Sequence, residues 1–128
     1  MDKAQALHLF WSSFGIPAID EQSAYDDQTL EQLGISYPYI SYESATSSFD
    51  EQLTLGADIW YHSTSWAGIE QKASQISEAI GLGGTHQHYE GGSLWITRGQ
   101  MFSQRMPSDS TNNIRRIHIN INAEFQSA

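Results

Sequence analysis

Two histidines separated by one residue, His86 and His88, are the first candidates for chemistry in this sequence. On a strand, residues two apart point to the same side of the sheet, so both imidazoles would share one face. His62 and His118 fall in other predicted strands and could join them. Zinc needs three or four ligands with supporting hydrogen bonds, and a hydrolytic site adds a general base. No HExxH motif completes this set, so a polar strand face is the favoured interpretation.

Three further patterns are typical of catalytic or phosphate sites, and each has a structural explanation here. The hydroxyl residues 63–65 follow His62 and could suggest a nucleophile with its base. Neighbours at a strand end rarely face one another, however, and there is no G-x-S-x-G elbow. The glycines of 81–84 follow a predicted helix, whereas a phosphate cradle opens one. The acidic pairs at 26–27 and 50–51 fall in predicted loops without an apolar pocket. We therefore predict no catalytic residue, metal ligand or cofactor.

The charges are unevenly distributed along the chain. The net charge is −9, which argues against a protein that holds nucleic acid by neutralising phosphates. Nine of the fifteen acidic residues lie between positions 20 and 58, and four of the six basic residues lie between 98 and 116. Two interpretations stay open: an unevenly charged, solvated surface, or complementary regions that meet within one chain or between identical chains.

The basic segment contains a pair of adjacent arginines that could bind phosphate or a carboxylate. Arginine suits bidentate ion pairs at interfaces, and the acidic net charge favours a protein partner over phosphate. The candidate interface therefore joins the basic and apolar residues of one segment to the acidic residues of another. Its members are Arg98, Met101, Phe102, Arg105, Arg115 and Arg116 on the basic side, and Asp20, Glu21, Asp26, Asp27 and Glu31 on the acidic side.

Hydrophobic spacing predicts the elements that position these residues. Apolar residues recur at helical spacing over 2–14 and over 66–80, where Gly81 can end the helix. Two long connections, 16–37 and 99–113, are predicted as loops that cover a neighbour or contact a partner. A Gly91-Gly92 pair predicts a hairpin. Strands are predicted over 37–43, 53–62, 85–90, 93–98 and 117–125.

The segment 117–125 has the clearest period of two, because five apolar residues alternate with four polar ones. We expect it to lie at the centre of the sheet with one face in the core. Its neighbours in sequence are hairpins, which favour antiparallel pairing. The predicted fold is α+β, with an antiparallel or mixed sheet of about five strands and two main helices packed on one face.

Composition limits the class of protein. With 128 residues and 39% hydrophobic residues, we expect one domain spanning 1–128. No apolar run is long enough for a transmembrane helix, and the N-terminus lacks the features of a signal peptide. The absence of cysteine excludes a disulfide framework, and it fits synthesis in a reducing cytoplasm.

Five segments carry a family resemblance that spans most of the chain. They are ALHLFWSSFGIPAID, PYISYE, ADIWYHSTSW, SLWITRGQMFSQRM and RRIHININAEF. Together they resemble small tail-completion or tail-terminator proteins of long-tailed bacteriophages that infect Gram-positive bacteria. The resemblance rests on aromatic and loop signatures, and no catalytic motif contributes to it.

The resemblance implies a structural virion protein with an α/β or α+β fold, made in the bacterial cytoplasm and located at the head-proximal end of the tail. It implies a hexameric ring that ends the tail tube and contacts both the tube protein and a head-closure or connector protein. DNA would only pass through the ring, along an acidic wall, and no membrane is involved. Two alternatives are a connector or tail tube subunit and, from another class, a small histidine-dependent metalloenzyme.

Overall fold

The apolar alternation near the C-terminus forms a long strand inside a six-stranded sheet. A computed structural model describes residues 2–21, 34, 36–45, 51–107 and 112–127. The helices are α1 (Lys3–Ser12) and α3 (Ala67–Ile80). The strands are β1 (Ala18–Asp20), β2 (Tyr39–Tyr42), β3 (Gln52–His62), β4 (Thr85–Tyr89), β5 (Gly92–Met106) and β6 (Ile114–Ser127).

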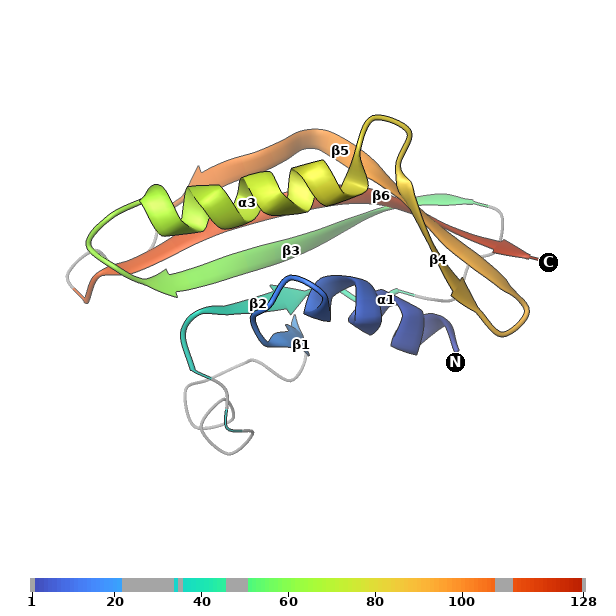
Figure 1. Cartoon of the computed structure of the whole chain (residues 1–128), viewed down its shortest axis with the longest axis horizontal. Helices are drawn as coiled ribbons and strands as arrows, with labels where there is room; N and C mark the ends of the chain where they lie inside the picture. The colour runs from blue at the N-terminus through green and yellow to red at the C-terminus, as the bar shows by residue number, and fades with distance from the viewer. Residues whose placement is uncertain (1, 22–33, 35, 46–50, 108–111, 128) are drawn as a thin grey trace.

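The strand order is β1-β2-β3-β6-β5-β4, which places β6 in the middle of the sheet (Figure 1). β6 pairs antiparallel with β3 along one side and with β5 along the other. Its alternate residues from Ile117 to Phe125 are at most 1% exposed. The expectation that this segment is the central strand is therefore confirmed.

Both helices cover the same face of the sheet. α3 lies along β3, β5 and β6, and α1 lies against β1, β4 and β5 (Figure 1). One continuous core joins Leu7 and Trp11 of α1, Ile69 and Ile76 of α3, and the inward side chains of the strands. The predicted arrangement of two helices on one face is thus confirmed, as is the broad α+β class. We call this face the covered face and the opposite one the open face.

Local signals explain where the helices begin and end. Asp2 accepts a hydrogen bond from the Gln5 amide at 2.8 Å and Gln5 accepts one from the Asp2 amide at 2.9 Å, which forms a capping box. α3 begins without a side-chain cap on its first turn and ends at Gly81, whose φ of 72° suits a residue without a Cβ. The described helices have 10 and 14 residues, and neither is long and apolar enough to cross a membrane.

The estimate of about five strands is wrong, because the sheet has six. The additional strand, β1, lies within the segment predicted to be irregular, and it pairs in parallel with β2. It has three residues, and so short a strand contains too few alternations to produce a readable period. β1 can be recognised as a strand only from its hydrogen-bonded pairing with β2 in the structure.

The prediction of a loop over 99–113 is wrong for residues 99–106, which belong to β5. The register of β5 against β6 shifts between Arg98, which faces Ile121, and Ser103, which faces Ile119. Four residues of β5, 99–102, therefore lie opposite Asn120 alone, so β5 holds three extra residues there and its alternation is interrupted. We call residues 99–102 the β5 bulge. The interruption hides the second half of the strand from sequence patterns.

Candidate functional site

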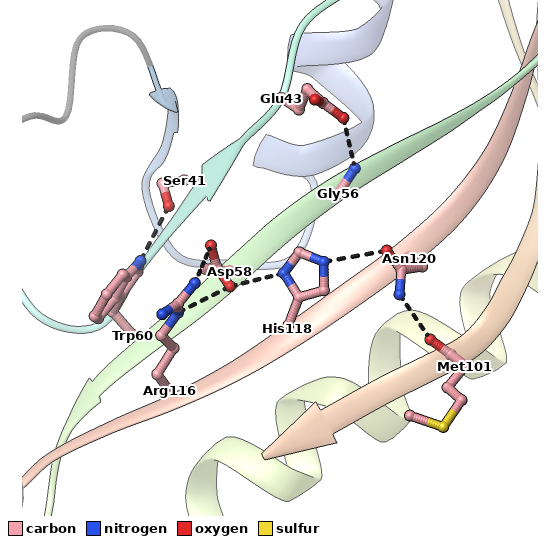
Figure 2. Close-up of polar contacts among 9 residues, drawn as sticks. All are labelled: Ser41, Glu43, Gly56, Asp58, Trp60, Met101, Arg116, His118 and Asn120. Atoms are coloured by element: carbon pink, nitrogen blue, oxygen red, sulfur yellow. Dashed lines mark hydrogen bonds and ion pairs between the residues drawn. The ribbon is translucent and has the colours of Figure 1, made fainter. Parts of the chain in front are cut away.

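A polar network crosses the open face between β3 and β6, centred on Asp58. Asp58 lies directly opposite His118 in the strand register and is only 9% exposed. Its carboxylate accepts hydrogen bonds from Arg116 Nε at 3.0 Å, Arg116 Nη2 at 3.3 Å and His118 Nδ1 at 2.9 Å (Figure 2). Two basic groups thus compensate a largely buried carboxylate, as burial of a charge requires.

The network continues from His118 to the β5 bulge. Asn120 Nδ2 donates to the Met101 carbonyl at 3.0 Å, so the Asn120 Oδ1 faces His118 Nε2, at 3.1 Å (Figure 2). The two ring nitrogens of His118 therefore lie between two oxygen atoms, Asp58 Oδ1 on one side and Asn120 Oδ1 on the other. Asn122 Nδ2 donates to the Arg98 carbonyl at 3.3 Å. Two asparagines of β6 therefore hold the two sides of the bulge.

Aromatic side chains extend the open face toward β2. The rings of Trp60 and Tyr39 stack at 6.1 Å between centroids. Trp60 Nε1 donates to Ser41 Oγ at 3.0 Å (Figure 2). The guanidinium of Arg116 lies 5.1 Å from the centre of the Trp60 ring. These contacts complete the hydrogen bonding of the indole and add a cation–π interaction to the ion pair with Asp58.

Two further carboxylates lie beside this network. Glu43 accepts a hydrogen bond from the Gly56 amide at 3.1 Å (Figure 2). Slight burial of the largely exposed Glu21 carboxyl, and then the nearby charges of Glu43, Asp58 and Asp20, raise the pKa of Glu21, while His118 lowers it. The open face near β1 and β2 is therefore rich in carboxylates whose charges oppose one another.

The four predicted interface arginines have different environments. Arg98 donates from Nε and Nη2 to the Ser77 carbonyl in the last turn of α3, at 3.1 and 2.7 Å. Arg116 faces the opposite way and binds Asp58. Arg105 and Arg115 share one tryptophan, Trp66, at the start of α3, with their guanidinium carbons 4.6 and 5.4 Å from its ring centre. The structure thus brings two of the four arginines together.

The remaining interface candidates are also spread over the molecule. Met101, in the β5 bulge, is 62% exposed, whereas the neighbouring Phe102 packs against the core. Asp20 is the last residue of β1 and Glu21 follows it. The other acidic candidates, Asp26, Asp27 and Glu31, lie outside the described residues.

The histidine pair lies on the edge strand β4, on the open face. His86 and His88 are exposed, and the His86 ring stacks on Trp95 of β5 at 6.0 Å. β5 separates this strand from β6, which carries His118, and His62 lies on β3 beyond β6. Within the described ranges, no group of three or more histidine, aspartate or glutamate residues is placed to hold a metal ion.

Sequence reasoning missed Asp58, Asn120 and Trp66 as members of functional or interface clusters. Asp58 is a carboxylate in the middle of a strongly apolar strand, and that position is the signal that could have identified it. A tryptophan at helical spacing usually packs inward, so the sequence pattern assigns Trp66 to the core. Comparisons with protein-family models, with characterised proteins and with solved structures found no match to this chain.

Proposed function

We propose that this chain is a structural virion protein that ends the tail tube of a long-tailed bacteriophage and joins the tail to the head. The five segments that resemble tail-completion and tail-terminator proteins suggest this role. The α+β sheet, covered by two helices on one face, is compatible with it. The closer likeness to the tail-terminator fold is part of the proposal.

One observation carries the assembly role: basic groups lie on one face of the sheet and exposed acidic groups lie on the opposite face. Arg105 and Arg115 lie with Trp66 on the covered face, and Glu21 and Glu43 lie near Asp58 of the open face. Different surfaces that complement each other make head-to-tail contacts, and such contacts close into rings when the rotation allows. We therefore propose a hexameric ring on the last ring of the tube.

The acidic charge suits a ring through which DNA passes. A chain with a net charge of −9 repels the phosphate backbone, so DNA slides through without binding. The proposed protein partners are the tail tube protein on one side and a head-closure or connector protein on the other. In this proposal the chain is at the head-proximal end of the tail, no membrane takes part and no cofactor is needed.

The first test is the mass and shape of the purified chain. Six chains of 14.4 kDa make a ring of about 86 kDa, which light scattering measures and negative-stain images show directly. The second test is a phage that lacks this chain: its tails are expected to have uncontrolled lengths and to remain unattached to heads.

Other outcomes favour the alternatives. A particle reconstruction that locates the chain along the tube identifies a tube subunit. A reconstruction that locates it inside the head connector identifies a connector subunit. Stoichiometric bound metal that is lost in the double variant His86→Ala, His88→Ala identifies a metalloprotein. A phage that assembles normal tails without the chain contradicts the proposal.

A further inference from the structure

The arginines differ in how much of each guanidinium the chain itself uses. Arg98 is half-buried and gives two hydrogen bonds to one carbonyl of α3. The Arg116 side chain is 29% exposed and gives two hydrogen bonds to Asp58. Both guanidiniums therefore have structural partners within the chain, and both side chains are less exposed than that of Arg105.

Arg105 and Arg115 form a different environment around Trp66, which we call the Trp66 patch. Arg105 pairs with Glu70 at 2.7 Å, and the two side chains are 55% and 43% exposed. Arg115 gives a single hydrogen bond of 3.3 Å from Nη2 to the Thr64 carbonyl. The patch thus contains two guanidiniums and one carboxylate, at the positive end of the α3 dipole. The patch has a net positive charge in an acidic chain.

The chemistry of the patch is suited to binding carboxylates. A guanidinium that stacks on an aromatic ring uses its flat face there and keeps its N–H edge for a carboxylate. Tryptophan and arginine are also the residue types most enriched among the energetically dominant residues of protein interfaces. The patch therefore combines an aromatic ring with two guanidiniums that lie against it. The Nε of Arg115 is buried, so its terminal N–H groups are the ones that can reach a partner.

The complementary surface lies on the other side of the sheet. Glu21 and Glu43 are exposed, and Glu21 lies near three other carboxylates, Glu43, Asp58 and Asp20. Asp58 already has Arg116 and His118 as partners, so Glu21 and Glu43 remain the accessible charges. Arg105 faces Ile117 in the register and shares its covered face, so the sheet separates the patch from these two carboxylates. Their contact has to join two chains.

We infer that the Trp66 patch of one copy binds the Glu21 and Glu43 carboxylates of a second copy. This contact rests on the proposed ring and identifies the residues that join its subunits. The contact retains Arg105 and Arg115, which belong to the broader interface predicted from the sequence, and it adds Trp66 and Glu43. Arg98 and Arg116 are not part of it, because they stabilise the fold. The contact is heterologous, so repetition around an axis produces a ring.

A charge-swap experiment tests the contact by sedimentation of the full chain at low and high salt. Two double variants are compared: one carries Arg105→Glu and Arg115→Glu, and the other carries Glu21→Arg and Glu43→Arg. Each is expected to weaken self-association by about tenfold or more, because like charges then meet at the contact. A mixture of the two variants restores association, because alternating copies form oppositely charged contacts, half with the wild-type signs and half with the signs reversed. Wild-type association weakens as salt increases.

Matched controls separate the contact from general effects of charge and folding. The first control is the double variant Arg105→Gln, Arg115→Gln, which changes the net charge by −2. A second double variant, Gln71→Glu, Ala79→Glu, makes the same change in net charge on the exposed side of α3. Only the first pair weakens association. Arg98→Gln lowers thermal stability but leaves association unchanged. The single variant Glu21→Arg retains the hydrogen bond from the Gly56 amide to Glu43, so it remains informative if the double variant fails to fold.

The outcomes distinguish this contact from the proposed function. If the folded double variant Arg105→Glu, Arg115→Glu forms the same ring as the wild type, the proposed contact is wrong but the ring is retained. A mixture that associates no better than its components also overturns it. A salt-sensitive closed dimer that the charge swap restores supports the contact and contradicts the ring. A wild-type chain that stays monomeric overturns the contact, and the tail lengths of phage lacking the chain then decide the function.

Discussion

Asp58 shows how a single buried charge can organise one face of a sheet. Its cross-strand partner is His118, and Arg116 lies two residues before that histidine on the same face of β6. A carboxylate that is 9% exposed would be strongly unfavourable without these two groups. The polar residues that alternate with the isoleucines of β6 are therefore bonded to β3 and β5 as well as facing solvent.

The first residue-scale prediction concerns this carboxylate. Asp58→Asn keeps the shape of the side chain but leaves Arg116 without its counter-charge and weakens the contact with His118, so the free energy of unfolding decreases by about 1–3 kcal/mol. Urea denaturation measures the change. Adding Arg116→Gln is expected to cost less in the Asp58→Asn background than in the wild type, and a double-mutant cycle without such coupling contradicts the ion pair.

The second residue-scale prediction concerns pH and Glu21. Because its pKa is raised above the ordinary value of 4.5, the folded chain binds this proton more tightly than the unfolded chain does. The corresponding stability is present below pH 4.5 and is lost as the pH rises through the raised pKa. Glu21→Gln avoids that loss, so the variant is more stable than the wild type at pH 7, by about 0.5 kcal/mol or less on this exposed residue.

Thermal melts of the variant and the wild type between about pH 3 and pH 8 measure this difference. The two curves are expected to converge at low pH, where Glu21 is protonated and resembles glutamine. Glu90→Gln, at an exposed hairpin position far along the chain, is the control for removing one negative charge. An equal stabilisation by both substitutions would show that net charge, and not the neighbours of Glu21, is responsible.

At the scale of elements, the β5 bulge explains several residues that the sequence leaves without a role. Asn120 and Asn122 hold the carbonyls of Met101 and Arg98, so the three extra residues of β5 keep a defined conformation. The bulge turns Met101 to solvent while Phe102 packs against the core. A bulge of this kind changes the direction of side chains without ending the strand.

Gly99 provides the element-scale prediction. It is buried, and a Cβ there would lie 2.8 Å from the Asn120 carbonyl oxygen, which is backbone and cannot move aside without disturbing β6. Gly99→Ala is therefore expected to lower the free energy of unfolding by about 1–3 kcal/mol. Gly83→Ala is the control, because no atom lies within 4 Å of its Cβ position. Denaturant melts of both variants test this, and equal stability of the two would contradict the tight packing at the bulge.

α3 illustrates how one element joins two roles. Its narrow apolar seam, Ile69, Ala73, Ile76 and Ile80, packs on the sheet, as its spacing predicts. Its last turn receives Arg98 at the Ser77 carbonyl, where a positive charge also complements the helix dipole. Its first turn lies beside Trp66 with Arg105 and Arg115. The C-terminal end of α3 thus binds an arginine that stabilises the fold, and its N-terminal end lies beside the two arginines of the proposed contact.

At the scale of the whole molecule, the sheet separates two kinds of surface. The covered face contains the core and both helices, and the Trp66 patch lies at its edge. The open face contains the Asp58 network and the exposed carboxylates Glu21 and Glu43. A molecule with opposite charges on opposite faces is suited to assembly with copies of itself, which is the basis of the proposed ring.

The long elements were predictable because periodicity needs only local information. β3, β4, β6 and α3 each agree with their predicted segments to within a few residues, and α1 ends two residues earlier than predicted. β1 was missed because three residues contain no readable period, and residues 99–106 were missed because the bulge interrupts the alternation. The candidate interface residues were chosen by charge and by the two apolar side chains Met101 and Phe102. The sequence could not show which of the four arginines bind groups within the chain, because their carbonyl and carboxylate partners lie far away in sequence.

The sequence by itself determined the α+β class, the central position of the C-terminal strand and the face on which its isoleucines are buried. These features follow from hydrophobic spacing, which is a property of neighbouring residues. Only the tertiary structure decided that Asp58 meets His118 and Arg116 and that Arg105 meets Arg115 at Trp66. Those contacts join residues far apart in the chain, and strand register and helix position bring them together.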